Sequence, residues 1–336
     1  MTDFSSGHAS QSVLVTGAGG YIGSALVKTL AAAGPSRIVL LDSSEHNLFQ
    51  IRQHVESVFP EVASEAVLGS VVDVGLLDDI FTRFQPEVIY HAAAFKHVPL
   101  LERNPIAAVR NNAIGTYTLA EAALRHGTPK LILISTDKAV NPHSIMGVSK
   151  RLAELVVVAL SGHATRMNAI RLVNVIGSPG SVVPIFLTQI AERKPVTVTH
   201  PEATRWFMSL HEAVLAILAA GAAEIDRRIV VPQLGEQTRI ADLAKFLIGA
   251  ASEVPIVFTG CRPGDKLTEE LFSKTETKEG SIEGPLQVIG TCRLQPGELN
   301  KIIERLSICI VSHNVPGLIQ ALVSVVPEYV PSTIVR

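Results

Sequence analysis

Four consecutive residues, Ser135-Thr136-Asp137-Lys138, have side chains that could carry proton-transfer chemistry. They stand at the end of an apolar run, 131–135, that predicts a buried strand. Ligands of open parallel sheets bind beyond the carboxyl ends of the strands, where the backbone can turn neighbouring side chains to one side. There the carboxylate of Asp137 and the amine of Lys138 would form an acid–base pair. On a solvated surface the same dipeptide would be an ordinary ion pair.

A glycine-rich turn follows another apolar run, 12–16, and precedes a helical pattern at 24–33. The GxGxxG spacing fails because position 22 is Ile, whereas GxxGxxG fits. Either spacing gives a tight turn, close backbone approach to a pyrophosphate and a helix N-terminus facing its charge. The turn predicts a dinucleotide site, and an unoccupied structural turn is the alternative. The residues expected to line the cofactor here are Gly17, Gly20, Tyr21, Ile22 and Gly23.

Asp42 stands at the end of the next apolar run, 37–41, at the distance where a dinucleotide site places an acid. A carboxylate there can accept hydrogen bonds from both ribose hydroxyls of NAD, and it would repel the 2′-phosphate of NADP. Ser43 and Ser44 follow Asp42 in place of an arginine, so we expect NAD rather than NADP. Further residues are expected beside the cofactor: Asp73 and Val74 at the adenine edge, and Ala92, Ala93 and Ala94 where the cofactor backbone passes.

Met146 and Lys150 are spaced to share one face of a helix. The amine of Lys150 could bind the nicotinamide ribose, and its charge would favour hydride acceptance nearby. On an exposed face Lys150 would be an ordinary surface lysine. For Met146 alone we favour packing in the core, because a thioether neither donates nor accepts a useful proton.

The elements that must position these residues alternate along the chain. Continuous apolar runs predict strands at 12–16, 37–41, 66–69, 88–91, 131–135 and 169–175. Helical patterns between them predict helices at 24–33, 76–84, 105–126 and 149–160. This alternation predicts an α/β fold, a Rossmann-type doubly wound parallel sheet covered on both faces, with a smaller C-terminal substrate-binding region.

Beyond Gly177 prolines break the chain into short pieces, before helical patterns return at 240–251 and 299–308. The polar segment 275–284 predicts a mobile loop. We expect a flexible N-terminus at 1–11, a dinucleotide-binding domain at 12–176, and a mainly substrate-binding region at 177–336 that is interleaved with the first.

Composition narrows the possible classes. The 336 residues are 47% hydrophobic and 18% charged, which is enough for a large core, and a net charge of -2 argues against a general nucleic-acid binder. The three cysteines, Cys261, Cys292 and Cys309, form no CxxC pair, so we expect a reducing compartment and no structural metal. Residues 1–11 are polar and no apolar run approaches 18 residues, so we expect a cytoplasmic protein without a membrane span.

Longer stretches resemble a known family. The glycine turn, Asp42, Asn112-x-x-Gly115-Thr116, the Ser135–Lys138 run and Lys150 resemble the extended short-chain dehydrogenase/reductase superfamily. The blocks at 92–105, 135–151, 173–186, 195–208 and 261–271 resemble bacterial nucleotide-sugar dehydratases of polysaccharide biosynthesis, most of all the UDP-N-acetylglucosamine 4,6-dehydratases. The resemblance spans about residues 12–332.

The sequence departs from the family pattern at a few positions. Met146 stands where the superfamily normally has Tyr, although a branch of these dehydratases also carries Met. The change removes the phenol that usually takes a hydroxyl proton. Trp206, Asp265 and Thr268 also replace residues that are more frequent in the family, which leaves the sugar less well defined than the family.

The resemblance implies an internal redox cycle on a nucleotide sugar. NAD would take a hydride from C4, Lys138 would remove the C5 proton as a base, and Asp137 would protonate the departing C6 hydroxyl. Hydride return to C6 would give a 4-keto-6-deoxy sugar. We expect burial beside the cofactor to keep Lys138 partly neutral. The catalytic residues implied are Thr136, Asp137, Lys138, Met146 and Lys150, and Asn112 joins the cofactor site.

The same resemblance implies where the substrate binds. Lys96 and His97 would contact the sugar, Asn174 would lie near the phosphates, and Val182 and Val183 would pack on the base. Arg205 and Arg262 would pair with the pyrophosphate, and surface arginines are the alternative. We also expect a homo-oligomer.

Other reactions on this scaffold stay open. They are dehydration with C5 inversion, epimerisation, and a dehydration that forms an exocyclic alkene on another nucleotide sugar or nucleoside. A non-catalytic NAD-binding regulator is favoured only by the missing tyrosine.

Overall fold

The computed structural model describes residues 10–162, 164–249, 254–282, 286–291 and 294–335. Within these residues the main sheet has nine strands in the order β14-β15-β11-β6-β5-β4-β1-β2-β3. The strands from β3 to β11 are parallel, and β15 and β14 add to one edge in antiparallel fashion. The strands are β1 (Ser12–Thr16), β2 (Arg37–Asp42), β3 (Ser64–Leu68), β4 (Val88–His91), β5 (Lys130–Thr136), β6 (Arg166–Leu172), β11 (Ile229–Pro232), β14 (Thr277–Ile282) and β15 (Leu286–Gly290). The order 3-2-1-4-5-6 confirms the predicted Rossmann-type, doubly wound sheet.

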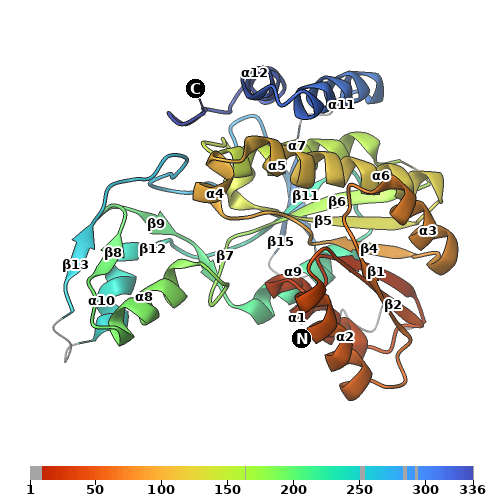
Figure 1. Ribbon diagram of the computed structural model, residues 1–336, viewed down its shortest axis with the longest axis horizontal. Coiled ribbons are helices and arrows are strands. Elements are labelled where there is room, and N and C mark those ends of the chain that lie inside the picture. The colour runs from red at the N-terminus through yellow and green to blue at the C-terminus, as the bar shows by residue number, and fades with distance from the viewer. Residues whose placement is uncertain (1–9, 163, 250–253, 283–285, 292–293, 336) are drawn as a thin grey trace.

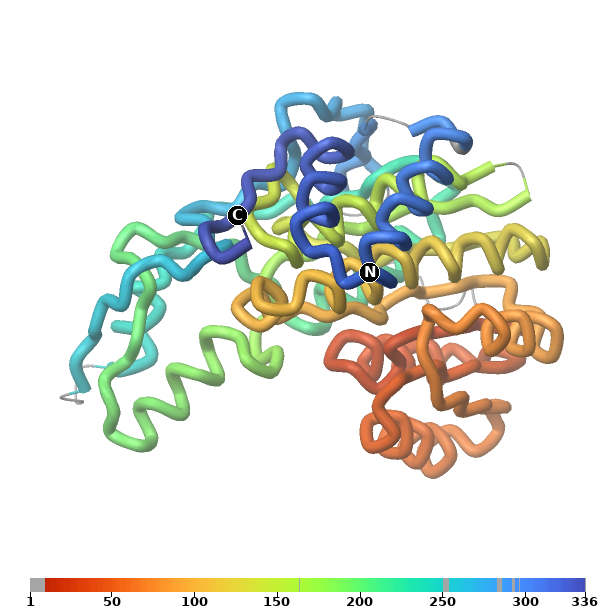
Figure 2. The backbone as a smooth tube through the Cα atoms, turned by 45° about the horizontal axis from the view of Figure 1, so that its top comes forward, coloured from red at the N-terminus to blue at the C-terminus, as the bar shows by residue number. Residues whose placement is uncertain are grey.

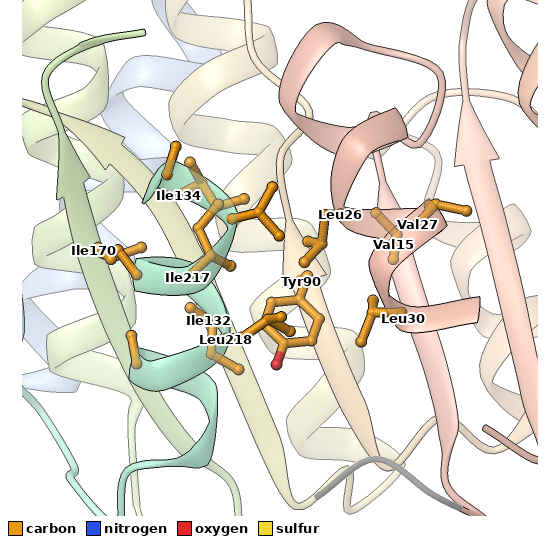
Figure 3. Packing of buried hydrophobic residues seen from close by; sticks show 14 of the residues in the cluster. Val15, Leu26, Val27, Leu30, Tyr90, Ile132, Ile134, Ile170, Ile217 and Leu218 are labelled. Carbon is orange, nitrogen blue, oxygen red and sulfur yellow. The ribbon is translucent and has the colours of Figure 1, made fainter. Parts of the chain in front are cut away.

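Helices cover both faces of this sheet (Figure 1). One face packs against α1 (Tyr21–Ala32), α2 (Glu45–Val58) and α9 (Leu210–Ala222). Figure 3 shows side chains of α1 and α9 meeting the strands around the ring of Tyr90, which is completely buried. The other face packs against α3 (Val74–Phe84), α6 (Gly115–Arg125) and α7 (Ile145–Leu160). Burial on both faces explains why the strands are continuous apolar runs.

A third layer lies over helix α7. It consists of α11 (Pro296–Val311) and α12 (Val315–Val325), which cross the helices on that face (Figure 2). Every residue of α7 from Ile145 to Ala159 is therefore buried. The helix that carries Met146 and Lys150 is held from two sides.

A small lobe stands to one side of the sheet in Figure 1 and packs around Phe186, Val196 and Val198. Its elements are α8 (Val182–Ala191), β8 (Val196–Val198), β9 (Thr204–Arg205), β12 (Thr238–Arg239), α10 (Ile240–Ile248) and β13 (Ile256–Phe258). The short pair of β7 (Asn174–Val175) and β10 (Phe207–Met208) connects the lobe to the sheet. Strands β11, β14 and β15 come from beyond residue 177 but pair within the main sheet.

Several boundaries differ from the sequence predictions. The expected loop at 275–284 is largely strand β14, which pairs with β15 and has a bulge between Lys278 and Gly280. Both of its faces are mostly exposed, so no apolar alternation marked it. The expected strand at 169–175 is two strands, β6 and β7, and α1 starts earlier than position 24. Helix α10 ends at Ile248 with Gly249 as its C-cap, and residues 250–251 of its predicted range, as well as Cys292, lie outside the described residues.

Two helices show features that the patterns did not predict. Helix α2 was missed, although Ser44 caps it by accepting a hydrogen bond from the amide of Asn47. The helix expected at 105–126 consists of α5 (Pro105–Val109), a widened π turn at Arg110–Ile114, and α6. The short helix α4 (Val98–Glu102) precedes it.

Candidate active site

The glycine turn forms a cradle of backbone at the end of β1. Gly17 adopts φ +67°, and a Cβ there would lie 2.7 Å from the backbone nitrogen of Ala93. Gly19, which the spacing argument left out, approaches α2 so closely that a Cβ would lie 2.5 Å from the carbonyl carbon of Asn47. Gly20 is the N-cap of α1, and Tyr21, Ile22 and Gly23 form its first turn. The cradle therefore suits a pyrophosphate that needs close contact with backbone amides.

Asp42 lies beside this cradle and is 8% exposed. Its Oδ2 accepts a hydrogen bond from the Gly19 amide at 2.9 Å, and its Oδ1 accepts one from the Ser44 amide at 2.9 Å. Each carboxylate oxygen can still accept a second hydrogen bond, so Asp42 could hold ribose hydroxyls. Ser43, which lies between Asp42 and Ser44 in the sequence, is exposed.

The other expected cofactor residues have different surroundings. Asp73 caps α3 by accepting from the Leu76 amide at 3.0 Å, and Val74 is exposed. The Ala92 amide donates to the Thr16 carbonyl, Ala93 packs on Gly17, and Ala94 is exposed. The three alanines follow β4, and Ala92 and Ala93 lie against the cradle.

The side chain of Asn112 binds other protein groups, and its role at the cofactor stays a prediction. Its Oδ1 accepts from the Phe95 amide at 2.8 Å, and its Nδ2 donates to the Phe95 carbonyl and to Ser149 Oγ, both at 3.0 Å. The side chain is completely buried within the π turn. Asn112 therefore ties the loop after β4 to helix α7.

Asp137 and Lys138 both turn inward at the end of β5. A 3₁₀ turn, Asp137–Ala139, follows the strand, and Thr136 caps it. Lys138 Nζ donates to Asp137 Oδ1 at 2.9 Å and to Asn174 Oδ1 at 3.2 Å. Asp137 is completely buried, and its Oδ2 has no hydrogen-bond partner among the described residues. Asp137 is thus enclosed, and Lys138 is partly buried with 23% of its side chain exposed, so the two differ from an ion pair on an open surface.

The charge state of Lys138 differs from the expectation. Burial lowers the pKa of Lys138, but the negative charges of Asp137 and Glu269 outweigh burial and hold the pKa above its usual value. The lysine with a lowered pKa is Lys150, for which burial brings the pKa to about 8. Lys150 Nζ donates to the Ile134 carbonyl at 2.7 Å, so it sits under the end of β5. Met146 is 4% exposed and packs in the core between α7 and the third layer.

The residues expected to bind the substrate lie on several separate segments. Lys96 donates to the Pro179 carbonyl at 3.1 Å and His97 lies against Gly180, so the loops after β4 and β7 meet. Val182 and Val183 start α8, and Arg262 is exposed with Nε 3.1 Å from Asp265 Oδ2.

Asn174 and Arg205 have protein partners that the sequence did not predict. Asn174 accepts from Lys138 Nζ and donates to the Trp206 carbonyl, so it lies beside the acid–base pair. Arg205 donates through Nη1 and Nη2 to backbone carbonyls of Thr204, Leu267 and Lys266 at 2.7 to 3.0 Å. These bonds hold the loop at 262–269, which favours a structural role for Arg205 over a pyrophosphate clamp.

A buried ionic network lies directly behind the acid–base pair. Glu154 accepts from Ser135 Oγ at 2.7 Å and pairs with Arg171 at 2.8 Å. Arg171 also pairs with Glu276 at 2.7 Å and donates to the Leu271 carbonyl at 2.9 Å. Arg151 joins both carboxylates at 3.0 Å. The network fastens the loop at 269–276 to β5, β6 and α7, and sequence reasoning found none of it.

Two further observations concern the described part of the chain. No helix there is both long enough and apolar enough to cross a membrane. No cluster of three or more His, Cys, Asp or Glu side chains there could hold a metal ion.

Known proteins resemble this chain in sequence. Residues 13–288 match the family described as polysaccharide biosynthesis protein. The probable polysaccharide biosynthesis protein EpsC of Bacillus subtilis is 45% identical over 278 residues, 81% of this chain and 46% of that protein. The UDP-N-acetylglucosamine 4,6-dehydratase (inverting) of Campylobacter jejuni is 32% identical over 273 residues, 80% of this chain and 79% of that protein. The chain thus spans about half the length of relatives such as EpsC.

A solved structure agrees in fold. DesIV, a dTDP-glucose 4,6-dehydratase from Streptomyces venezuelae with NAD and TYD bound, superposes with a TM-score of 0.68 at 22% identity. The match covers 77% of this chain and 88% of that one.

Proposed function

Because the chain belongs to the polysaccharide biosynthesis protein family, within the short-chain dehydrogenase/reductases, we propose that it is an NAD-dependent dehydratase of a nucleotide-activated sugar. The proposed product is a 4-keto-6-deoxy sugar, and UDP-N-acetylglucosamine is the substrate we favour. The name of the Campylobacter jejuni relative supports this choice of sugar. In this proposal residues 12–176 bind the dinucleotide and residues 177–336 mainly bind the substrate.

The observation that carries the proposal is the pair of buried Asp137 and partly buried Lys138 at the carboxyl end of β5. The glycine cradle at the end of β1 lies at the same edge of the sheet, because the two strands are parallel. A dinucleotide on the cradle would therefore extend toward the pair.

We assign each side chain a separate role in the proposed reaction. When bound, NAD would supply a hydride acceptor for C4 and then a hydride donor for C6. Lys138 would pass a proton to Asp137 and, once neutral, would take the C5 proton, which the C4 ketone acidifies. Asp137 would hold a proton for the departing C6 hydroxyl, and its unpartnered Oδ2 is suited to that task. Lys150 would bind the ribose beside the nicotinamide.

The test is incubation of the protein with NAD and a panel of nucleotide sugars, followed by mass spectrometry. We expect one sugar to lose one water without net consumption of NAD. Recovery of unchanged mass from every sugar would contradict a dehydratase. Product analysis then separates the open alternatives: C5 inversion, epimerisation and an exocyclic alkene each give a distinct product.

A further inference from the structure

Glu269 is a buried carboxylate that the proposed reaction leaves without a role. It lies on the loop after β13 and is 3% exposed. Its Oε1 is 3.5 Å from Lys138 Nζ and 3.5 Å from Arg205 Nε. Its Oε2 is buried without a hydrogen-bond partner among the described residues. A buried carboxylate with so few hydrogen bonds is costly, so its position calls for an explanation.

Lys138 lies between two carboxylates that come from different parts of the chain. Asp137 precedes it, whereas Glu269 arrives from the loop at 262–276. A small cavity of about 30 Å³, wide enough for a water molecule, borders Lys138 and Glu269. The other charged or titratable groups that act on this cluster are Arg205, Lys266, His143 and Glu270.

Arg205 is not a sufficient ion-pair partner to explain why the carboxylate of Glu269 is buried. The Nη atoms of Arg205 already bind three backbone carbonyls, so only its Nε faces Glu269, and at 3.5 Å. Arg205 and Lys266 bring positive charge toward Lys138. Like charges would drive the proton off Lys138, and a carboxylate on the same side opposes them.

We propose that Glu269 is a positioning residue that acts through Lys138: beside the cavity it holds the ammonium group against Asp137 and keeps it charged until the reaction begins. This inference rests on the proposed function only for its role in turnover. The effect of Glu269 on the charge of Lys138, here called the charge clamp, can be measured without any substrate.

The first experiment measures the protonation of Lys138 directly. The wild-type protein and its variants are labelled with acetic anhydride over a pH series, and the extent of labelling at Lys138 is read by peptide mass spectrometry. In Glu269→Gln we expect Lys138 to become reactive at a pH lower by about one unit, because one neighbouring charge is lost. Exposed Lys28 on α1 serves as the internal reference.

Two variants control this experiment. Glu270→Gln changes the adjacent, exposed glutamate, whose Oε2 accepts from Asn141, and should leave the Lys138 profile unchanged. Glu269→Asp keeps the charge and should keep the profile near that of the wild type. A folded Glu269→Gln protein with the wild-type Lys138 profile would overturn the proposal, as would an equal shift in Glu270→Gln.

The second experiment follows solvent-deuterium exchange at C5 of the sugar against pH. Removal of the Glu269 charge should move the rising limb of this profile to lower pH, which a merely structural role would not do. A shifted labelling profile without turnover of any sugar would support the charge clamp and contradict the dehydratase. Turnover with an unshifted labelling profile would support the dehydratase and overturn the clamp.

Discussion

The two halves of the site are built in different ways. Most of the cofactor half comes from one continuous stretch, in which the Gly17 amide donates to the Leu41 carbonyl and the Asp42 carboxylate accepts from the amides of Gly19 and Ser44. The catalytic half brings Lys138 together with Asn174 and Glu269, which lie on β7 and on the loop after β13. Backbone hydrogen bonds tolerate most single substitutions, whereas a buried charge that loses its partner is left uncompensated. We therefore expect the catalytic half to be the more fragile of the two.

The largest expected effect is on the rate. Lys138→Met removes the proposed base but keeps the stem, so C5 exchange should fall by about 10²–10⁴-fold. Met146→Leu keeps volume and polarity and should stay within roughly tenfold of the wild type. Solvent-deuterium exchange at C5, measured by mass spectrometry, compares the two. Exchange at the wild-type rate in Lys138→Met would place the base elsewhere.

The next effect is on stability. Arg171→Met leaves Glu154 and Glu276 buried without their shared partner, and should cost about 3–5 kcal/mol of unfolding free energy. Arg239→Met removes an exposed pair with Glu202 and should change stability by less than about 1 kcal/mol. Urea unfolding of both variants measures the difference. Equal losses of unfolding free energy in the two variants would show that burial does not make the network more sensitive to substitution.

The same network predicts a dependence on acid. Burial would raise the pKa of the Glu276 carboxyl, but hydrogen bonds and charge from Arg171 bring it down to about 2. A carboxyl whose folded pKa is depressed stabilises the protein above its unfolded pKa, and that stability is lost as pH falls toward the folded value. We expect a loss of about 3 kcal/mol between about pH 5 and pH 2. Glu276→Gln should flatten this part of the urea-unfolding profile, and an unchanged slope would contradict the assignment.

The smallest effect belongs to the cofactor half. NAD should bind at least about tenfold more tightly than NADP, which corresponds to about 1.4 kcal/mol. Asp42→Ala should narrow that gap, because it removes the carboxylate that meets the ribose. Asp79→Ala, which removes an exposed aspartate paired with Arg83, should leave the gap unchanged. Calorimetry that gives equal affinities in the wild type would refute the preference.

The division between the cofactor half and the catalytic half also separates what the sequence predicts from what it does not. The glycine turn and Asp42 were found because short-range spacing and a buried strand define them. Asp137 and Lys138 were found because a strand end predicts where side chains converge. The parallel sheet was found because its strands are continuously apolar.

The remainder depends on contacts that spacing does not encode. The side chain of Asn112 binds Phe95 and Ser149 from within a π turn, and the sequence pattern predicted neither the π turn nor these contacts. Glu269 was missed because nothing in its local pattern distinguishes it from the exposed Glu270 beside it. The pKa of Lys138 is held above its usual value by the adjacent Asp137 and, to a smaller extent, by that distant carboxylate, which the local pattern does not reveal.

The edge strand β14 bears on how copies of the chain could assemble. An exposed strand edge offers free amides and carbonyls to a second sheet, and bulges and charges on the edge strand prevent such joining. Strand β14 has both, since its bulge falls between Lys278 and Gly280 and Glu279 lies within it. Growth of one continuous sheet across two molecules is therefore disfavoured at this edge. The homo-oligomer, which stays a prediction, would have to form through other surfaces.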